Sequence, residues 1–180
     1  MTRLLPTLLA VLLLAAPALA APPVPPEHYP LSQKHVEQFL SVSTGLVKKA
    51  EADPTFKARL EAHREGNSHT VAVGRGGTMT THANWNTTAK DLPEVRALIT
   101  SAGAEPAEFD KVYLAVVAAV MVKQMAPFMK GAETRAALDK GTTPSNLKLV
   151  TANAATVEPA MKALQDTFGK KKKKRTTEEE

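Results

Sequence analysis

The metal-binding potential of this sequence rests on its histidines, because the chain contains no cysteine. The five histidines are His28, His35, His63, His69 and His82. None of them forms a His-Glu-x-x-His motif, so a zinc site would have to be assembled partly from a loop. The candidate ligands are then His63, His69 and His82, completed by an acid such as Glu65. The alternative, which we favour, is that these histidines are exposed or locally hydrogen-bonded, and we therefore predict no cofactor.

A glycine-rich segment surrounds Arg75. The sequence runs Gly-Arg-Gly-Gly-Thr from Gly74 to Thr78. Backbone N–H groups of such a loop can bind an anion, and Arg75 would add a positive charge. However, the Gly-Lys-Ser/Thr ending of a P-loop is missing. The favoured alternative is a hairpin turn, in which glycine supplies a positive φ.

No motif in the sequence specifies a nucleophile. Serine and threonine are frequent, but Gly-x-Ser-x-Gly does not occur, and no pair of carboxylates stands out. His82 and Trp85, the only tryptophan, lie in an irregular stretch where they could line a pocket. More often such a tryptophan pins a loop onto the core, because its large ring buries much area. The candidate binding residues are therefore Arg75, His82 and Trp85.

The C-terminal end carries a run of charge. Five lysines, beginning at Lys170, precede Arg175, and three glutamates end the chain. Each basic residue near an anionic surface contributes about 1 kcal/mol, so this tail could contact an anionic lipid or another polyanion. The alternative, which we favour, is that residues 170–180 form a solvated, disordered tail.

The first 20 residues have the features of a secretory signal peptide. Arg3 is their only charged residue, the centre is apolar, and the segment ends in the small-x-small pattern of Ala18 and Ala20. We predict cleavage near Ala20 and export to the periplasm or the extracellular space. The alternative is an uncleaved anchor, but a spanning helix needs about 20 apolar residues, and this run is shorter and contains prolines. Residues 21–30 are rich in proline, which predicts a stiff spacer.

The basic character of the chain resides in its tail. Arg3 and the six cations of the tail account for seven of the 23 Lys and Arg residues, which leaves 16 in residues 21–169. Three of the 18 acids lie in the tail, which leaves 15 in the same stretch. A nucleic-acid-binding domain needs its positive charge clustered on the folded surface, so this near balance argues against one.

Apolar periodicity predicts an all-α, helical bundle-like single domain over residues 31–169. Four main helices are expected over 32–52, 91–103, 105–127 and 144–168, with a short helix over 54–65 and a helical connector over 131–140. Ser32 is the expected N-cap of the 32–52 helix, and Asp53 is that of the short 54–65 helix. Because the 105–127 helix is apolar on all sides between Val112 and Val122, we predict that it is the buried central helix, ended or kinked by Pro127. Pro159 should bend the last helix.

Residues 66–90 lack a helical period, so we predict that they form one long irregular or hairpin loop. Strands are expected over 70–73 and 78–82, and a two-stranded hairpin would have to lie on the helices, since it is marginal alone in water. A loop of this length in a compact domain is usually functional or disordered. We therefore expect the 66–90 loop to be the contact surface of the protein.

The C-terminal third resembles a group of exported, uncharacterised helical proteins. The resemblance rests on the stretch from Pro144 through Asn153 to Val157, after a helix start marked by Gly103, Pro106 and Phe109. The resemblance implies an all-α fold, and it implies no particular biochemical activity.

Together these features predict a non-enzymatic exported protein that binds a protein partner or a small ligand at the cell envelope, and that is not an integral membrane protein after cleavage. One alternative is a small metal-dependent or hydrolase-like exported enzyme, with His63, His69 and His82 near its site. The other is a protein that associates with an anionic surface through the basic tail from Lys170 to Arg175.

Overall fold

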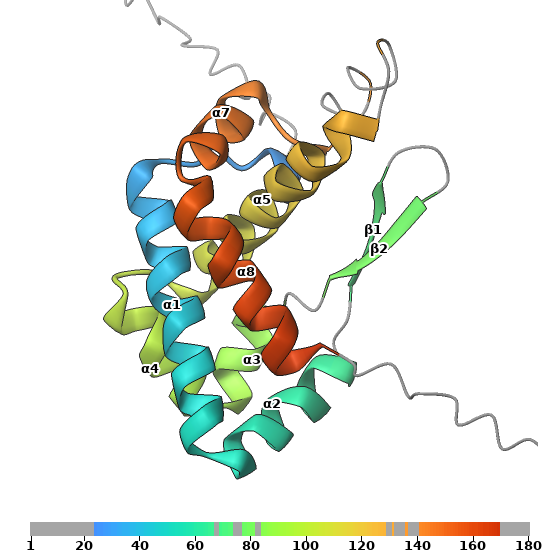
Figure 1. Cartoon of the computed structure of the whole chain (residues 1–180). Helices are drawn as coiled ribbons and strands as arrows, with labels where there is room; N and C mark the ends of the chain where they lie inside the picture. The colour runs from blue at the N-terminus through green and yellow to red at the C-terminus, as the bar shows by residue number, and fades with distance from the viewer. Residues whose placement is uncertain are drawn as a thin grey trace, which may run out of the picture.

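The computed structural model describes residues 24–66, 69–73, 77–81, 84–128, 131, 136 and 141–169, and in the stretch 65–83 it describes the backbone alone. This part of the chain is an all-α domain with one β-hairpin, as predicted (Figure 1). Its α-helices are α1 (Gln33–Ala52), α2 (Pro54–Gly66), α3 (Trp85–Asp91), α4 (Pro93–Ser101), α5 (Pro106–Met125), α7 (Pro144–Ala152) and α8 (Ala154–Phe168). The strands are β1 (His69–Val73) and β2 (Gly77–Thr81), and the short 3-10 turns are η1 (Pro26–His28) and η2 (Ala126–Phe128).

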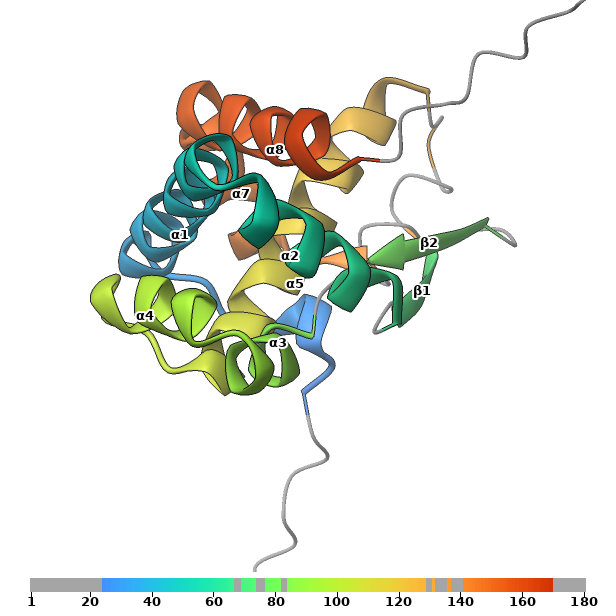
Figure 2. The same ribbon diagram turned by 90° about the horizontal axis from the view of Figure 1, so that it is seen from below.

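Helix α5 is the central element of the domain, as its apolar sequence predicts. Residues on all of its sides are buried, and they include Phe109, Tyr113 and Val120. Helices α1, α3, α4 and α7 and the turn η1 contact it, and Figure 2 shows it running through the middle of the helical body. The predicted end is confirmed, because α5 stops at Met125, just before the turn that contains Pro127.

The length and composition of Pro106–Phe128 would also allow it to cross a membrane, alone among the helices that the structure describes. This observation is weak evidence for a membrane span, because a buried core helix has the same length and apolar composition. The contacts of α5 with the surrounding helices account for its apolar character.

Both predicted N-caps are confirmed. The hydroxyl of Ser32 accepts a hydrogen bond from the backbone N–H of His35 at 3.4 Å, and Nδ1 of His35 accepts one from the N–H of Ser32 at 3.1 Å. This is a capping box in which histidine takes the place of the usual glutamate. Asp53 Oδ1 accepts from the N–H of Phe56 at 2.9 Å and begins α2.

The predicted 66–90 loop is a hairpin followed by a helix. Strands β1 and β2 pair antiparallel in a regular register from His69 opposite Thr81 to Val73 opposite Gly77. The prediction of a loop was wrong for its last part, where Trp85–Asp91 forms α3. The helix begins because Asn84 caps it, its side chain accepting from the N–H of Thr87 at 3.0 Å, and because Trp85 is buried against α5.

The hairpin does not lie along the helices, contrary to our expectation. Figures 1 and 2 both show it projecting from the helical body, beyond the end of α2.

The helix that we predicted over 91–103, which is α4, ends beside Gly103, as expected. Gly103 has a φ of 73°, a left-handed conformation that side chains disfavour. Its N–H bonds to the carbonyl of Thr100, and the N–H of Ala104 bonds to the carbonyl of Ile99, which is the Schellman pattern. The Gly103 carbonyl accepts at 2.7 Å from the buried side chain of Gln38, so this helix end is joined to α1.

The last predicted helix is two helices. The chain leaves helical geometry at Asn153, whose ψ is 14°, and α7 and α8 meet there. Pro159, where we predicted a bend, lies inside α8, and the bend itself stays a prediction. The apolar period did not reveal the break because buried residues continue at helical spacing on both sides, at Val150 and Val157.

The N-terminal segment is part of the domain from Pro26 onward, which shortens the predicted spacer of residues 21–30. The buried side chain of Asn146 accepts from the N–H of Leu31 and donates to the carbonyl of Tyr29, both at 2.9 Å. The Tyr29 hydroxyl donates to Glu108 on α5 at 2.9 Å. These bonds tie the segment to α7 and α5.

We expect Asn146→Ala to lower the free energy of unfolding by roughly 2 to 4 kcal/mol, because it leaves one backbone N–H and one carbonyl of the segment without partners. Urea denaturation followed by circular dichroism measures this change. Ser145→Ala, at an exposed position one residue earlier, should change stability by less than about 0.5 kcal/mol. Equal effects of the two substitutions would contradict the anchoring role of Asn146.

Candidate functional site

A groove of 720 Å³ lies between α5 and α8. Its apolar lining, called the floor below, consists of Val117, Val120 and Met121 from α5 with Ala154, Ala155, Pro159 and Met161 from α8, of which Ala155 and Pro159 are exposed. Its rim is polar and consists of Gln124 from α5 with Glu158, Lys162, Gln165 and Asp166 from α8. An apolar floor beneath a few polar groups is the usual composition of a small-ligand site.

The groove follows from the way α8 is packed. Helix α8 lies along α1, and Figure 1 shows it diverging from α5, which runs behind it. Near the start of α8 the residues that face the gap are Ala154 and Ala155, whose side chains are too short to fill it. Val117 and Val120 are then left as the base of the hollow.

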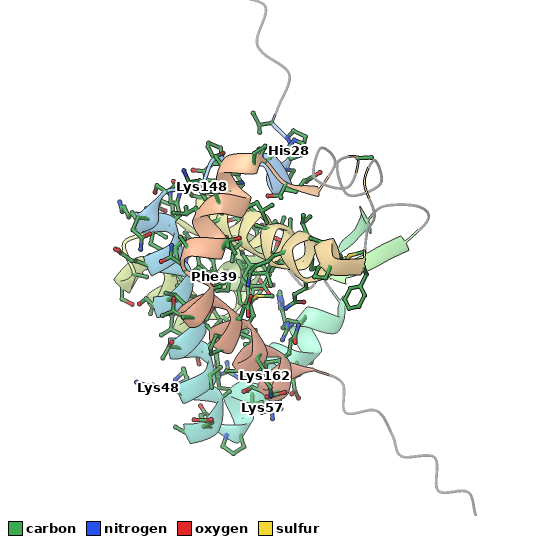
Figure 3. The ribbon with its side chains drawn as sticks, turned by 45° about the horizontal axis from the view of Figure 1, so that its top comes forward. His28, Phe39, Lys48, Lys57, Lys148 and Lys162 are labelled. Carbon is green, nitrogen blue, oxygen red and sulfur yellow. The ribbon has the colours of Figure 1, made fainter. Side chains whose placement is uncertain are left out.

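The charges on the rim are paired. Lys123 Nζ donates to Glu158, and this ion pair joins the two walls of the groove. Lys162 Nζ lies 2.5 Å from Asp166 Oδ2 on the exposed side of α8, where Figure 3 labels it. Each pair contributes little to stability, since exposed ion pairs are worth about 0 to 1 kcal/mol. Because the two pairs cancel in charge, the rim does not favour a ligand of either sign.

His63 is held by two neighbours on α3. Its Nε2 lies 2.6 Å from Asp91 Oδ2, and its Nδ1 lies 3.3 Å from the hydroxyl of Thr88. A metal at His63 would have to replace one of these contacts, since a ligand nitrogen needs a free lone pair. Among the described residues no three His, Asp or Glu side chains are placed to hold a metal ion. The structure does not describe the side chain of His69 or any part of His82, so the zinc hypothesis stays a prediction.

The contacts from Thr88 through His63 to Asp91 follow the order of a nucleophile, a base and an orienting acid. However, Thr88 is only 2% exposed, and its hydroxyl donates its single proton to the carbonyl of Asn84 at 2.8 Å. A nucleophile must instead give that proton to the base. These contacts therefore do not activate Thr88; they connect α2 to α3.

Trp85 is a core residue. Its ring is 3% exposed and packs edge-on against Tyr113, at 5.3 Å between centroids, and against Phe109 at 5.9 Å. Its backbone N–H donates to Asp110 Oδ1 at 2.5 Å. This placement agrees with the interpretation of Trp85 as a residue that pins the chain to the core, rather than with a surface binding role.

Burial perturbs two ionisable groups beside this cluster. It raises the pKa of Tyr113 above the ordinary value of 10.0, an effect that the nearby charge of Arg64 partly offsets. It also lowers the pKa of Arg64, whose guanidinium lies over the ring of Phe168 at 5.3 Å from its centroid.

The remaining sequence candidates, Arg75 and His82, and the tail from Lys170 lie outside the described residues. Sequence reasoning missed the groove itself. The available signal was the pair of alanines at the start of α8, opposite a helix that is apolar on all sides.

Comparison of this chain with protein-family models, curated proteins and solved structures found no match. The site must therefore be interpreted from its own geometry.

Alkaline titration should show both tyrosines of the chain ionising above the ordinary pKa of 10.0 in the folded protein. The pKa of Tyr113 is raised by burial, and that of Tyr29 by burial and then by its hydrogen bond to Glu108. Unfolded tyrosines ionise near pH 10, so this stabilising contribution is complete below that pH and is lost as the pH rises through the raised values. Tyrosinate absorbance measures the ionisation directly.

Tyr113→Phe is the control for this titration, because it keeps the ring and removes the ionisable group. The unfolding midpoint of this variant should fall less steeply above pH 10 than that of the parent. Tyrosinate that appears with a midpoint at the ordinary value in the folded parent would contradict the raised pKa of the two phenols.

Proposed function

We propose that this protein is an exported, non-enzymatic binding protein whose ligand is a small amphipathic molecule without net charge. The observation that carries the proposal is the groove between α5 and α8. It has an apolar floor, a polar rim and a size of 720 Å³, which lies within the range of about 300 to 1,000 Å³ typical of small-molecule sites.

The residues of the groove favour this class of ligand. Met121 lines the groove from α5 and Met161 from α8, and methionine side chains adapt to apolar groups of irregular shape. Gln124 and Gln165 place an amide on each side of the rim, and each amide offers both hydrogen-bond donors and an acceptor. The charged rim residues are neutralised by one another, so a ligand with net charge gains no partner there.

The N-terminal sequence supports the exported location. Residues 1–20 combine a basic start, an apolar centre and the small residues Ala18 and Ala20 before the expected cleavage point. The absence of cysteine means that the domain depends on apolar packing and needs no disulfide to be stable outside the cell. An exported carrier or receptor of a small amphipathic molecule is consistent with both features.

This proposal places the ligand in the groove rather than at the 66–90 segment that we first expected to be the contact surface. The change rests on the described side chains: Trp85 is buried in the core, and His63 is engaged by Asp91 and Thr88. Neither residue offers a free polar group at the surface, whereas the groove combines open volume with the exposed glutamines Gln124 and Gln165 on its rim.

Binding of a neutral fluorescent probe, N-phenyl-1-naphthylamine, tests the proposal. Ala155→Phe places a ring in the groove from an exposed backbone position and should raise the dissociation constant of the probe at least about tenfold. Ala97→Phe is the matched control, since Ala97 is also an exposed helical alanine but lies on α4, away from the groove. The thermal unfolding midpoints of both variants should remain close to that of the parent.

Failure of the parent to bind the probe would overturn the proposed ligand class. Binding that Ala155→Phe leaves unchanged, or that Ala97→Phe weakens equally, would place the ligand elsewhere on the protein. An anionic analogue of the probe, with a sulfonate added, should bind more weakly because its charge finds no partner on the rim.

A further inference from the structure

The β-hairpin presents two strand edges that no other described strand covers. The sheet formed by the described residues contains β1 and β2 alone, so each strand has one edge that pairs with no other described strand. Figures 1 and 2 show the hairpin projecting from the helical body, so helices do not flank it on both sides. A two-stranded hairpin is marginal in water, and three or more strands are needed for independent stability.

The strands lack most of the features that protect an exposed edge. Neither His69–Val73 nor Gly77–Thr81 contains a lysine, an arginine, an acid or a proline. Their register is continuous over all five pairs, so no bulge interrupts the ladder. Proteins usually protect edge strands with charge, proline or a bulge, because an unprotected edge pairs with another strand. Here the short length of the strands is the remaining protection.

We propose that the edge of β1 pairs antiparallel with the β1 edge of a second copy of this chain, which gives a four-stranded sheet across a two-fold axis. Full pairing of two five-residue strands about such an axis places the two copies of Val71, the central residue, opposite each other. This inference is independent of the proposed ligand groove, which lies between α5 and α8.

Two observations favour β1 over β2 as the paired edge. Strand β1 contains three apolar residues in succession, Val71, Ala72 and Val73, whereas β2 contains one, Met79, and apolar cross-strand pairs stabilise a sheet. Strand β2 begins with Gly77, and glycine weakens a strand.

The composition and length of strand β1 also favour a second copy of this chain as the partner. Two identical edges that contain no Lys, Arg, Asp or Glu approach without repulsion between such charges, and each provides a partner of equal length and the required antiparallel direction. The resulting sheet exceeds the two strands that are marginal alone.

Sedimentation velocity of the purified protein over a range of concentrations tests the inference. We expect a monomer–dimer equilibrium, and Val71→Lys or Val71→Glu should each raise its dissociation constant at least about tenfold, because like charges then lie directly opposite. Met79→Lys is the matched control. Met79 is the register partner of Val71 in the same hairpin but lies on the other strand, so it should leave the dimer intact.

Mixing the two variants separates a lost interface from a lost hairpin. Val71→Lys and Val71→Glu together should restore the dimer, because opposite charges across the axis attract, whereas a damaged hairpin would not recover. A parent protein that stays monomeric at all concentrations would overturn the inference. So would a dimer that only Met79→Lys dissociates, or a mixture that fails to associate.

Discussion

The apolar surface on all sides of α5 is the constraint on which the rest of the structure depends. A helix with this composition is stable in water only when other elements enclose it. Helices α1, α3, α4 and α7 and the turn η1 supply most of that enclosure, and the N-terminal segment takes part through Tyr29 and Asn146. The aromatic contacts of Trp85 and Tyr113 close the side from which the hairpin departs. With no disulfide available, this enclosure is the source of stability.

The candidate site lies where the enclosure is incomplete. Helix α8 packs on α1 and diverges from α5, so the strip of α5 that contains Val117 and Met121 faces a hollow instead of a neighbouring helix. Val117 and Val120 are only 6% and 1% exposed, so the hydrophobic gain on binding comes chiefly from the more exposed Met121, Met161, Ala155 and Pro159. The ion pair of Lys123 with Glu158 holds the two walls at a defined separation. The site therefore combines an apolar lining with walls joined by an ion pair, as the proposed binding of a small ligand requires.

Local signals in the sequence predicted the elements that depend on local interactions. The caps at Ser32 and Asp53, the buried α5 and the end of α4 at Gly103 could all be predicted, because each depends on a few neighbouring residues. Helix α3 could not, since its asparagine and threonine content conceals a helix that is stabilised by the burial of Trp85. The break at Asn153 was hidden by an apolar period that continues across it. The groove depends on the angle between α5 and α8, and the periodicity of a single helix contains no information about that angle.

Amide-resolved NMR during titration with N-phenyl-1-naphthylamine tests the central claim most directly, because it locates the ligand without a substitution. The account predicts that chemical-shift changes saturate with the ligand and concentrate in residues 117–124 of α5 and 154–166 of α8, which contain the lining of the groove. Changes centred on residues 63–91, or a titration with no saturable change in either helix, would contradict it.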